Sequence, residues 1–130
     1  MARTYSLVIR PERFCIHRLA PDAAFDLARL REASWYAIVR SEEELSVVAP
    51  DAIEFEAEAT EDGWSCLRVA GSLDFALVGV ISGLAAVLAD AGVSIFAVSS
   101  YDTDHILIKT VDIKSATRAL TDAGHSVRSG

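Results

Sequence analysis

The order of segments over residues 64–128 constrains the fold most. An alternating run, "WSCLRVAG", predicts a strand, and the following "SLDFALVGVISGLAAVLADAG" predicts a helix because its apolar residues recur at helical spacing. Two further strand-like runs, a short helix over residues 113–124 and a last strand, "HSVR", complete the order β-α-β-β-α-β. This order predicts an α+β, ferredoxin-like fold with an antiparallel sheet and helices on one face.

Two residues are expected to bound the long helix. Asp74 is placed to cap its start, because a carboxylate accepts hydrogen bonds from the free N–H groups of a first turn. Gly92 is placed to end it in a left-handed conformation. Inside the predicted helix, Gly79 and Gly83 form a G-x-x-x-G pattern, which we interpret as allowing close packing against a strand.

The first half of the chain repeats the pattern imperfectly. Residues 34–49 lie sixty positions before residues 94–109 and share with them a serine, a bulky pair, an alanine and a β-branched residue. Upstream, "CIHRLAPDAAF" echoes "CLRVAGSLDF", which places a shorter helix at Asp22–Leu30. Residues 50–63 are charged and have no clear apolar face, so we expect an irregular connection there instead of a second helix.

Internal similarity of this kind indicates duplicated structure. We therefore predict two tandem units in the chain. The first, over residues 1–62, is degenerate and carries an extra N-terminal strand at Tyr5–Arg10. The second, over residues 63–130, is complete.

Composition narrows the classes of function. Hydrophobic residues make up 52% of the chain and the net charge is -7, which argues against nucleic-acid or anionic-membrane binding, since both need clustered Lys and Arg. No apolar run is long enough for a bilayer span and no signal peptide is evident, so we expect a cytoplasmic protein. Cys15 and Cys66 allow one disulfide, but buried free thiols are the expectation for a cytosolic chain.

No pattern in the sequence is typical of an enzyme. The glycine motifs for phosphates and dinucleotides and the nucleophile elbow are absent. Cys15 and His17 share a strand face but have no third metal ligand nearby. Asp102, Asp104 and His105 could hold a cation, but Asp and Thr are common in turns because their side chains hydrogen-bond to the turn backbone. We expect no metal and no cofactor.

Residues 73–109, "LDFALVGVISGLAAVLADAGVSIFAVSSYDTDHILIK", resemble the ACT-domain family of small-molecule sensors. The matching parts are the glycine followed by two β-branched residues in the helix, the "AGVS" before the strand, and the hairpin "SSYDTDHIL". More narrowly, the segment is similar to the cytosolic arginine sensors and to the regulatory regions of aspartate kinases. The resemblance implies an ACT fold and a non-catalytic regulatory protein that binds an amino acid where two ACT units meet.

The resemblance also implies which residues bind the ligand. N–H groups at a helix start near Asp74 suit a ligand carboxylate, and the carboxylate of Asp104 suits an ammonium or guanidinium group. Thr103 stands where the arginine sensors have a second aromatic residue, so this chain departs from a pocket shaped for a guanidinium stem. The expected ligand-binding residues are Asp74, Phe75, Gly79, Ser82, Ser100, Tyr101, Thr103 and Asp104.

Several of these residues also have purely structural interpretations. Gly79 would allow packing, Asp74 would cap the helix, Tyr101 would lean over the core edge, and Asp104 would close the turn. A ligand-free dimerisation or protein-interaction module with the same fold is therefore the alternative function. A small enzyme on this scaffold is a third, and it would need a pair of perturbed catalytic groups in one cleft.

A homodimer is expected on two grounds. The resemblance implies it, because ACT units pair to complete their ligand sites. In "SIFAVSS", Phe96 and Val98 point to one face of the strand and Ile95 and Ala97 to the other. A sheet that is apolar on both faces, with helices on only one, needs a further partner.

Overall fold

The structure is a computed structural model that describes residues 3–74 and 77–130. Its contacts divide the chain into two compact units. The helical unit consists of Met1–Pro11 and Ser65–Gly130, and the insert unit consists of Glu12–Trp64.

This division differs from the expected boundaries near residue 62. The strand that was expected as an addition to the first unit belongs to the helical unit. The reason is that β1 (Ser6–Leu19) is one long strand that continues through Pro11. Its first part pairs with the last strand of the chain, β7 (Ser126–Ser129). Like β1, β4 (Ala59–Val69) supplies residues to both units.

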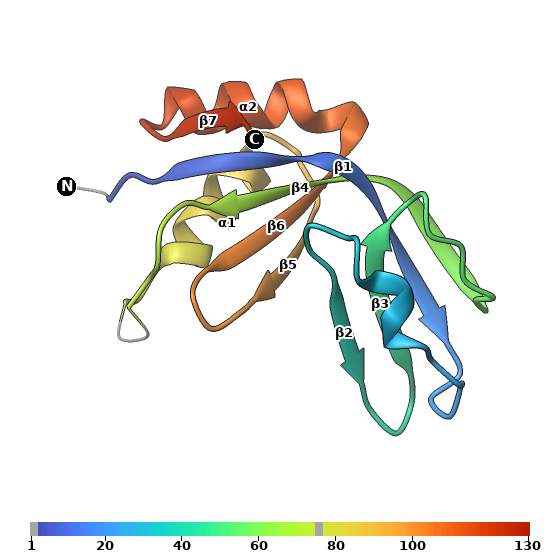
Figure 1. Ribbon diagram of the computed structural model, residues 1–130. Helices are drawn as coiled ribbons and strands as arrows, with labels where there is room; N and C mark the ends of the chain where they lie inside the picture. Colours follow the sequence, from blue (N-terminus) through green and yellow to red (C-terminus); the bar gives the residue numbers. More distant parts are fainter. Residues whose placement is uncertain (1–2, 75–76) are drawn as a thin grey trace. The chain divides into compact units, whose positions relative to one another are not determined.

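The helical unit contains the predicted β-α-β-β-α-β order. After β4 come α1 (Val80–Asp90), β5 (Ile95–Ser99), β6 (Asp104–Lys109), the short 3-10 helix η2 (Thr110–Asp112), α2 (Ile113–Asp122) and β7. The strands are ordered β7-β1-β4-β6-β5, so β1 lies between β4 and the final strand (Figure 1). The β5–β6 pair is antiparallel and the β1–β7 pair is parallel. The predicted α+β class is confirmed.

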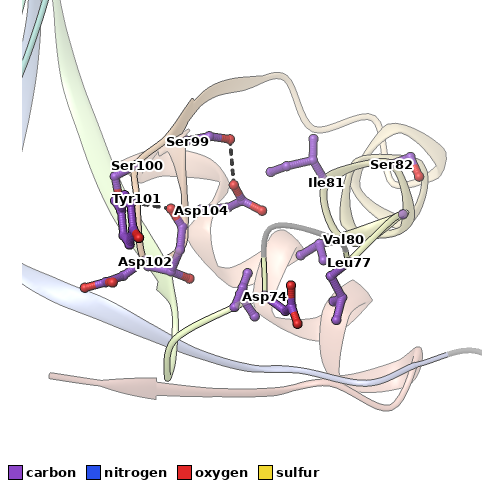
Figure 2. Close-up of a pocket in the computed structure, with 13 residues that line it drawn as sticks. Asp74, Leu77, Val80, Ile81, Ser82, Ser99, Ser100, Tyr101, Asp102 and Asp104 are labelled. Carbon is purple, nitrogen blue, oxygen red and sulfur yellow. Dashed lines mark hydrogen bonds between the residues drawn. The ribbon is translucent and has the colours of Figure 1, made fainter.

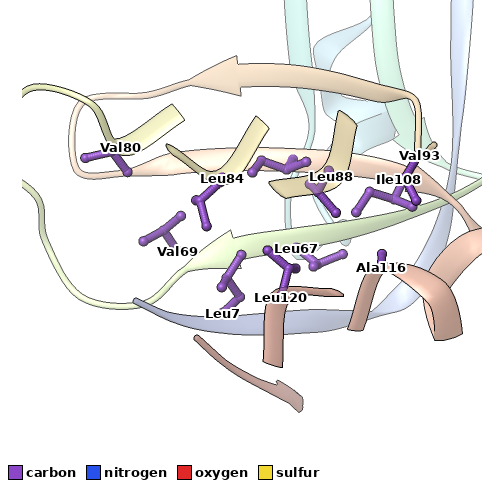
Figure 3. Close-up of a cluster of buried hydrophobic side chains, with 11 residues drawn as sticks. Leu7, Leu67, Val69, Val80, Leu84, Leu88, Val93, Ile108, Ala116 and Leu120 are labelled. Atoms are coloured by element: carbon purple, nitrogen blue, oxygen red, sulfur yellow. The ribbon is translucent and has the colours of Figure 1, made fainter. Parts of the chain in front are cut away.

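Both helices of this unit pack on one face of its strands (Figure 3). Val80, Leu84 and Leu88 form the buried stripe of α1, as the helical spacing predicted. Burying one such side chain stabilises the fold by about 1.5–3 kcal/mol. The buried cluster consists of Leu7, Leu67, Val69, Val80, Leu84, Leu88, Val93, Ile106, Ile108, Ala116 and Leu120.

The C-terminal end of α1 forms as predicted at Gly92. This glycine has a φ of +74°, and its N–H donates to the carbonyl of Ala89, while the N–H of Val93 donates to the carbonyl of Leu88. These are the two hydrogen bonds of a Schellman cap, which a left-handed residue makes possible.

The insert unit has strands in the order β2-β3-β1-β4, with β2 (Ala37–Arg40) and β3 (Leu45–Pro50) joined as an antiparallel hairpin. The helix expected at Asp22–Leu30 is wrong: only the 3-10 helix η1 (Leu27–Leu30) forms. Its single buried residue is too little to hold a longer amphipathic helix.

The second helix is absent from the insert unit, as expected, and residues 51–58 form turns and irregular structure. The irregular connection is shorter than the expected residues 50–63, because residues 59–63 belong to β4. A separate core fills this unit and consists of Leu19, Leu30, Leu45, Val47 and Ala49. Among the helices of the described residues, none has the length and hydropathy that a bilayer crossing requires.

Candidate functional site

A cavity of about 350 Å³ lies in the helical unit between the loop after β4, the start of α1 and the β5–β6 hairpin (Figure 2). Its volume is at the lower end of the range for ligand pockets, about 300–1,000 Å³, and suits a small molecule. The predicted residues that line it are Asp74, Gly79, Ser82, Ser100, Tyr101, Thr103 and Asp104. Phe75, the remaining predicted residue, lies outside the described residues.

Sequence reasoning missed part of the wall. The additional lining residues are Leu73, Leu77, Val80, Ile81, Ser99 and Asp102. Ser99 and Asp102 could have been predicted, because both belong to the polar stretch that contains the predicted hairpin residues. Leu77, Val80 and Ile81 are among the apolar residues whose helical spacing predicted the helix, and that spacing indicated only a face packed on the core. In the structure Ile81 is half-buried and lines the cavity.

The start of α1 lies at Gly79, so the prediction that Asp74 caps this helix is wrong. Gly79 has a φ of +84°, which breaks the helix, and the N–H of Gly83 donates to the Gly79 carbonyl at 2.9 Å. A Cβ at Gly79 would meet only Ser82 Oγ, at 3.8 Å, and one at Gly83 would meet nothing within 4 Å. The predicted close packing at these glycines is therefore wrong, and Gly79 is required by its conformation.

The helix start nevertheless faces the cavity, a few residues later than expected. Val80, Ile81 and Ser82 form the first turn of α1, and all three line the cavity. Their amides have no acceptor within the helix, since the first N–H groups of any α-helix lack one. Together with the positive end of the helix dipole, they favour a negatively charged group at this wall of the cavity.

The hairpin that forms the opposite wall is held by its own hydrogen bonds. The N–H and Oγ of Ser100 donate to the Thr103 carbonyl at 2.9 and 3.0 Å. Thr103 is only 4% exposed, and its Oγ1 donates to the Val69 carbonyl at 2.6 Å. The N–H of Leu73 donates to the Asp102 carbonyl at 2.6 Å, which fixes the loop after β4 to the hairpin. The hydroxyl proton of Thr103 is used in the hydrogen bond to Val69, so this residue holds the hairpin in position.

Carboxylates dominate the charge of the cavity. Figure 2 shows the carboxylates of Asp74 and Asp104 in the space between the hairpin and α1, whereas that of Asp102 points away from α1. Ser99 Oγ donates to Asp104 Oδ1 at 2.6 Å, which fixes this carboxylate. Among the described residues that line the cavity, none is Lys, Arg or His. The hairpin side is thus anionic and the α1 side attracts anions.

Exposed side chains flank the cavity. Tyr101 is 80% exposed, so the interpretation that it leans over the core edge is wrong. Val78, between two lining residues, is 90% exposed. Large apolar side chains at the edge of a cavity are typical of a surface that another molecule covers.

His105 follows Asp104 but does not compensate its charge. Successive residues of a strand point to opposite faces, so His105 is directed away from the cavity, and it is only 3% exposed. Burial and the nearby positive charges of Arg10 and Arg68 lower the pKa of His105 to about 4, against an opposing hydrogen bond to the Val98 backbone. The ring is therefore neutral at pH 7.

The other candidates for metal chemistry do not come together. Within residues 3–74 and 77–130, no group of three His, Cys, Asp or Glu side chains lies close enough to hold a metal ion. Cys15 and Cys66 are buried free thiols. Burial, with the carboxylates of Asp51 and Asp62, raises the pKa of Cys15 and keeps it protonated.

Residues 59–122 match the family model of the ACT domain. The fold is ACT-like. The matched segment contains the loop after β4, α1 and the β5–β6 hairpin, and therefore every residue that lines the cavity. A search of curated proteins finds no match to the sequence.

Solved structures agree with this fold. The chain is similar to protein Atu0741 from Agrobacterium tumefaciens, with 29% identity, a TM-score of 0.89, and coverage of 99% of this chain and 96% of that one. It is also similar to a Vibrio cholerae protein of unknown function, a possible transport protein, with 20% identity, a TM-score of 0.69, and coverage of 92% and 89%. A third similar structure is the regulatory subunit of aspartate kinase from Thermus thermophilus, with 12% identity, a TM-score of 0.63, and coverage of 90% and 96%. The predicted ACT fold and its likeness to aspartate kinase regulatory domains are confirmed, and the narrower likeness to arginine sensors stays a prediction.

Proposed function

We propose that this is a non-catalytic regulatory protein that binds an amino acid in the cavity of the helical unit. One observation carries the proposal: the segment that matches the ACT domain contains the cavity and all its lining residues. Structures with the same fold include regulatory subunits, which favours regulation over catalysis. In the same proposal the insert unit is a degenerate second ACT-like unit and the protein is cytoplasmic.

The chemistry of the cavity supports an amino acid as the ligand. An amino acid has a carboxylate that needs N–H donors and an ammonium group that needs acceptors. The first turn of α1 offers the donors, and Asp74 and Asp104 offer the acceptors. The apolar wall of Leu73, Leu77 and Ile81 suits the hydrocarbon part of a side chain.

The proposal includes a homodimer in which an ACT unit of a second copy covers the cavity. Tyr101 and Val78 are strongly exposed beside the lining residues, and a second copy would bury them. Strand β5 is the edge of the helical unit's sheet, and an edge strand is a position at which a strand of another chain can pair. Sedimentation of the purified protein tests this part: a monomer at every concentration would contradict the covered cavity.

A thermal-shift screen against the twenty amino acids tests the binding. A ligand at about 100 times its dissociation constant stabilises the native state by about 2.7 kcal/mol, so one or a few amino acids should raise the melting temperature clearly. Asp104→Ala should abolish that shift while the circular dichroism spectrum and the dimer stay unchanged. If no amino acid stabilises the protein, the interaction module is the better description.

A further inference from the structure

The insert unit has a cavity of its own, with a volume of about 410 Å³. Its walls come from the end of β1 and the loop after it, from η1, and from the irregular connection over residues 51–58. None of the described residues of the β2–β3 turn lines this cavity, whereas the β5–β6 turn forms a wall of the cavity in the helical unit. The two cavities are therefore different kinds of site.

This cavity lies where the insert unit lacks the second helix of the helical unit. In the helical unit, α1 and α2 pack into one core through residues such as Leu84 and Leu120. In the insert unit, the irregular connection alternates with a period of two: Ile53, Phe55 and Ala57 pack on the core, and the glutamates between them are exposed. Such a segment covers the face less completely than a helix does, and the cavity opens between it and η1.

Aromatic rings form the apolar wall of this cavity. Phe25 and Phe55 both line it, and their rings are stacked with centroids 5.7 Å apart and an angle of 13° between their planes. The ring of His17 lies against Phe55 with a centroid distance of 5.0 Å. Leu19, which is buried and lies two positions after His17 in β1, extends the same wall. These contacts hold an aromatic surface in place, and a ligand with an aromatic ring packs favourably on such a surface.

Arg29 brings a positive charge to the aromatic wall. Its guanidinium carbon lies 4.7 Å from the centroid of the Phe55 ring, and its Nη2 donates to the Glu54 carbonyl. Along the part of the chain that the structure describes, no carboxylate forms an ion pair with this guanidinium group. Asp26, the nearest acidic residue along the chain, accepts instead from the N–H of Ala28 at 3.0 Å. The guanidinium group is thus held at the cavity while its Nε and Nη1 donors stay available to an anion.

No other cation lines the cavity among the described residues. His17, behind the ring of Phe55, is neutral at pH 7, because burial lowers its pKa, and its Nδ1 shares a hydrogen bond with Thr60 Oγ1 at 2.9 Å. The carboxylate of Glu56 is exposed, so solvent screens its charge. The cavity therefore combines one cationic group with an aromatic surface.

From these observations we infer that the insert unit binds a small aromatic carboxylate, whose ring lies against Phe25 and Phe55 and whose carboxylate accepts from Arg29. The planar fork of a guanidinium group matches the two oxygens of a carboxylate, and charge-assisted pairs are the strong class of hydrogen bonds. The volume is within the range of ligand pockets and is sufficient for one ring with a short acid chain. This site is separate from the amino-acid cavity of the proposed function, so either can fail without the other.

Calorimetric titration of the full chain at pH 7 with matched compounds tests the ligand class. Phenylacetate carries the ring and the carboxylate, phenethyl alcohol lacks the charge, acetate lacks the ring, and phenylglycine adds an ammonium group to phenylacetate. We expect phenylacetate to bind at least about tenfold more tightly than the other three, since a charge-assisted hydrogen bond is about twice as strong as a neutral one.

The other outcomes of this titration would contradict the inference. Equal binding of phenethyl alcohol would overturn the role of Arg29, and equal binding of acetate would overturn the role of the aromatic wall. Tighter binding of phenylglycine would overturn the assignment to a carboxylate without an ammonium group. If none of the four compounds binds, the inference fails, while the thermal-shift screen with amino acids still decides the proposed function.

Variants of the insert unit locate the site. Arg29→Gln should remove the preference for phenylacetate over phenethyl alcohol, while Arg31→Gln, with the same charge change at the exposed end of η1 and outside the lining, should keep it. Ala24→Trp should abolish binding because the indole fills the cavity, and the position is exposed, so circular dichroism should show a native fold. Unchanged preference in a folded Arg29→Gln variant, or unchanged affinity in a folded Ala24→Trp variant, would refute the site. Glu56→Gln should bind phenylacetate at least as tightly as the native protein, and weaker binding would contradict an anionic ligand.

Discussion

His105 should make the stability of the protein depend on pH between 7 and 4. In the folded protein its pKa is about 4, mainly because the ring is buried and secondly because Arg10 and Arg68 are near, while an unfolded chain has the ordinary value of 6.5. Below pH 6.5 the unfolded chain therefore binds a proton that the folded protein does not. The free energy of unfolding is highest above pH 6.5 and falls as the pH approaches 4.

The size of this effect follows from the two pKa values. One pKa unit corresponds to about 1.4 kcal/mol, so the complete loss is at most about 3 kcal/mol, of which about 1–2 kcal/mol falls between pH 7 and pH 5. Burial lowers the pKa values of His17 and His125 as well, and these act in the same direction. The contribution of His105 must therefore be measured as a difference between two proteins.

Urea unfolding of the native protein and of His105→Gln, at pH 7 and at pH 5, gives this difference. Glutamine keeps a polar side chain in the strand but does not titrate. We expect the native protein to lose about 1–2 kcal/mol more than the variant between the two pH values. An equal loss in both proteins would refute the reasoning, because the ring would then be as easily protonated in the folded protein as in the unfolded chain.

Two further substitutions test the parts that shape the cavity. Gly79→Ala should lower the free energy of unfolding by about 1–2 kcal/mol, because an L-residue is strained at a φ of +84°. The matched Gly83→Ala should be neutral or stabilising, because that glycine is helical. Chemical unfolding measures both variants. Thr103→Val should lower the free energy of unfolding by about 1–3 kcal/mol, because it leaves the Val69 carbonyl without its hydroxyl donor. Thr117→Val, at a half-buried position of α2, is the control. A Thr103→Val variant as stable as the native protein would show that the hairpin does not depend on this hydrogen bond.

Periodicity was sufficient for the elements that bury a complete apolar face. The stripe of α1 was readable because Leu84 and Leu88 repeat at helical spacing, and its end was readable because Gly92 has one clear conformational use. The start of α1 was not readable. Asp74 has the right chemistry for a cap, but the left-handed backbone of Gly79 decides where the helix begins, and a glycine inside an apolar pattern gives no sign of that.

The polar residues that line the cavity could be predicted more easily than the apolar ones. Ser100, Tyr101 and Asp104 lie in one short polar stretch between two strands, and such a stretch stands out in a sequence. The division into units was harder to foresee. Nothing local in residues 6–9 indicates that they pair with residues 126–129, because strand partners are chosen by the tertiary structure.

The pairing of β1 with β7 has a consequence for how the chain folds. The N–H of Ser126 donates to the carbonyl of Tyr5, and the N–H of Tyr5 donates to His125 Nδ1, each at 3.0 Å, so the start of β1 and the start of β7 are bonded side by side. Figure 1 shows β1 and β7 running next to each other. Contacts between residues so distant in sequence raise the contact order, which slows folding. On the ribosome, β1 emerges long before β7 exists, and the helical unit can be completed only after β7 has left the exit tunnel. The insert unit has no such delay, since all its residues lie within one continuous segment.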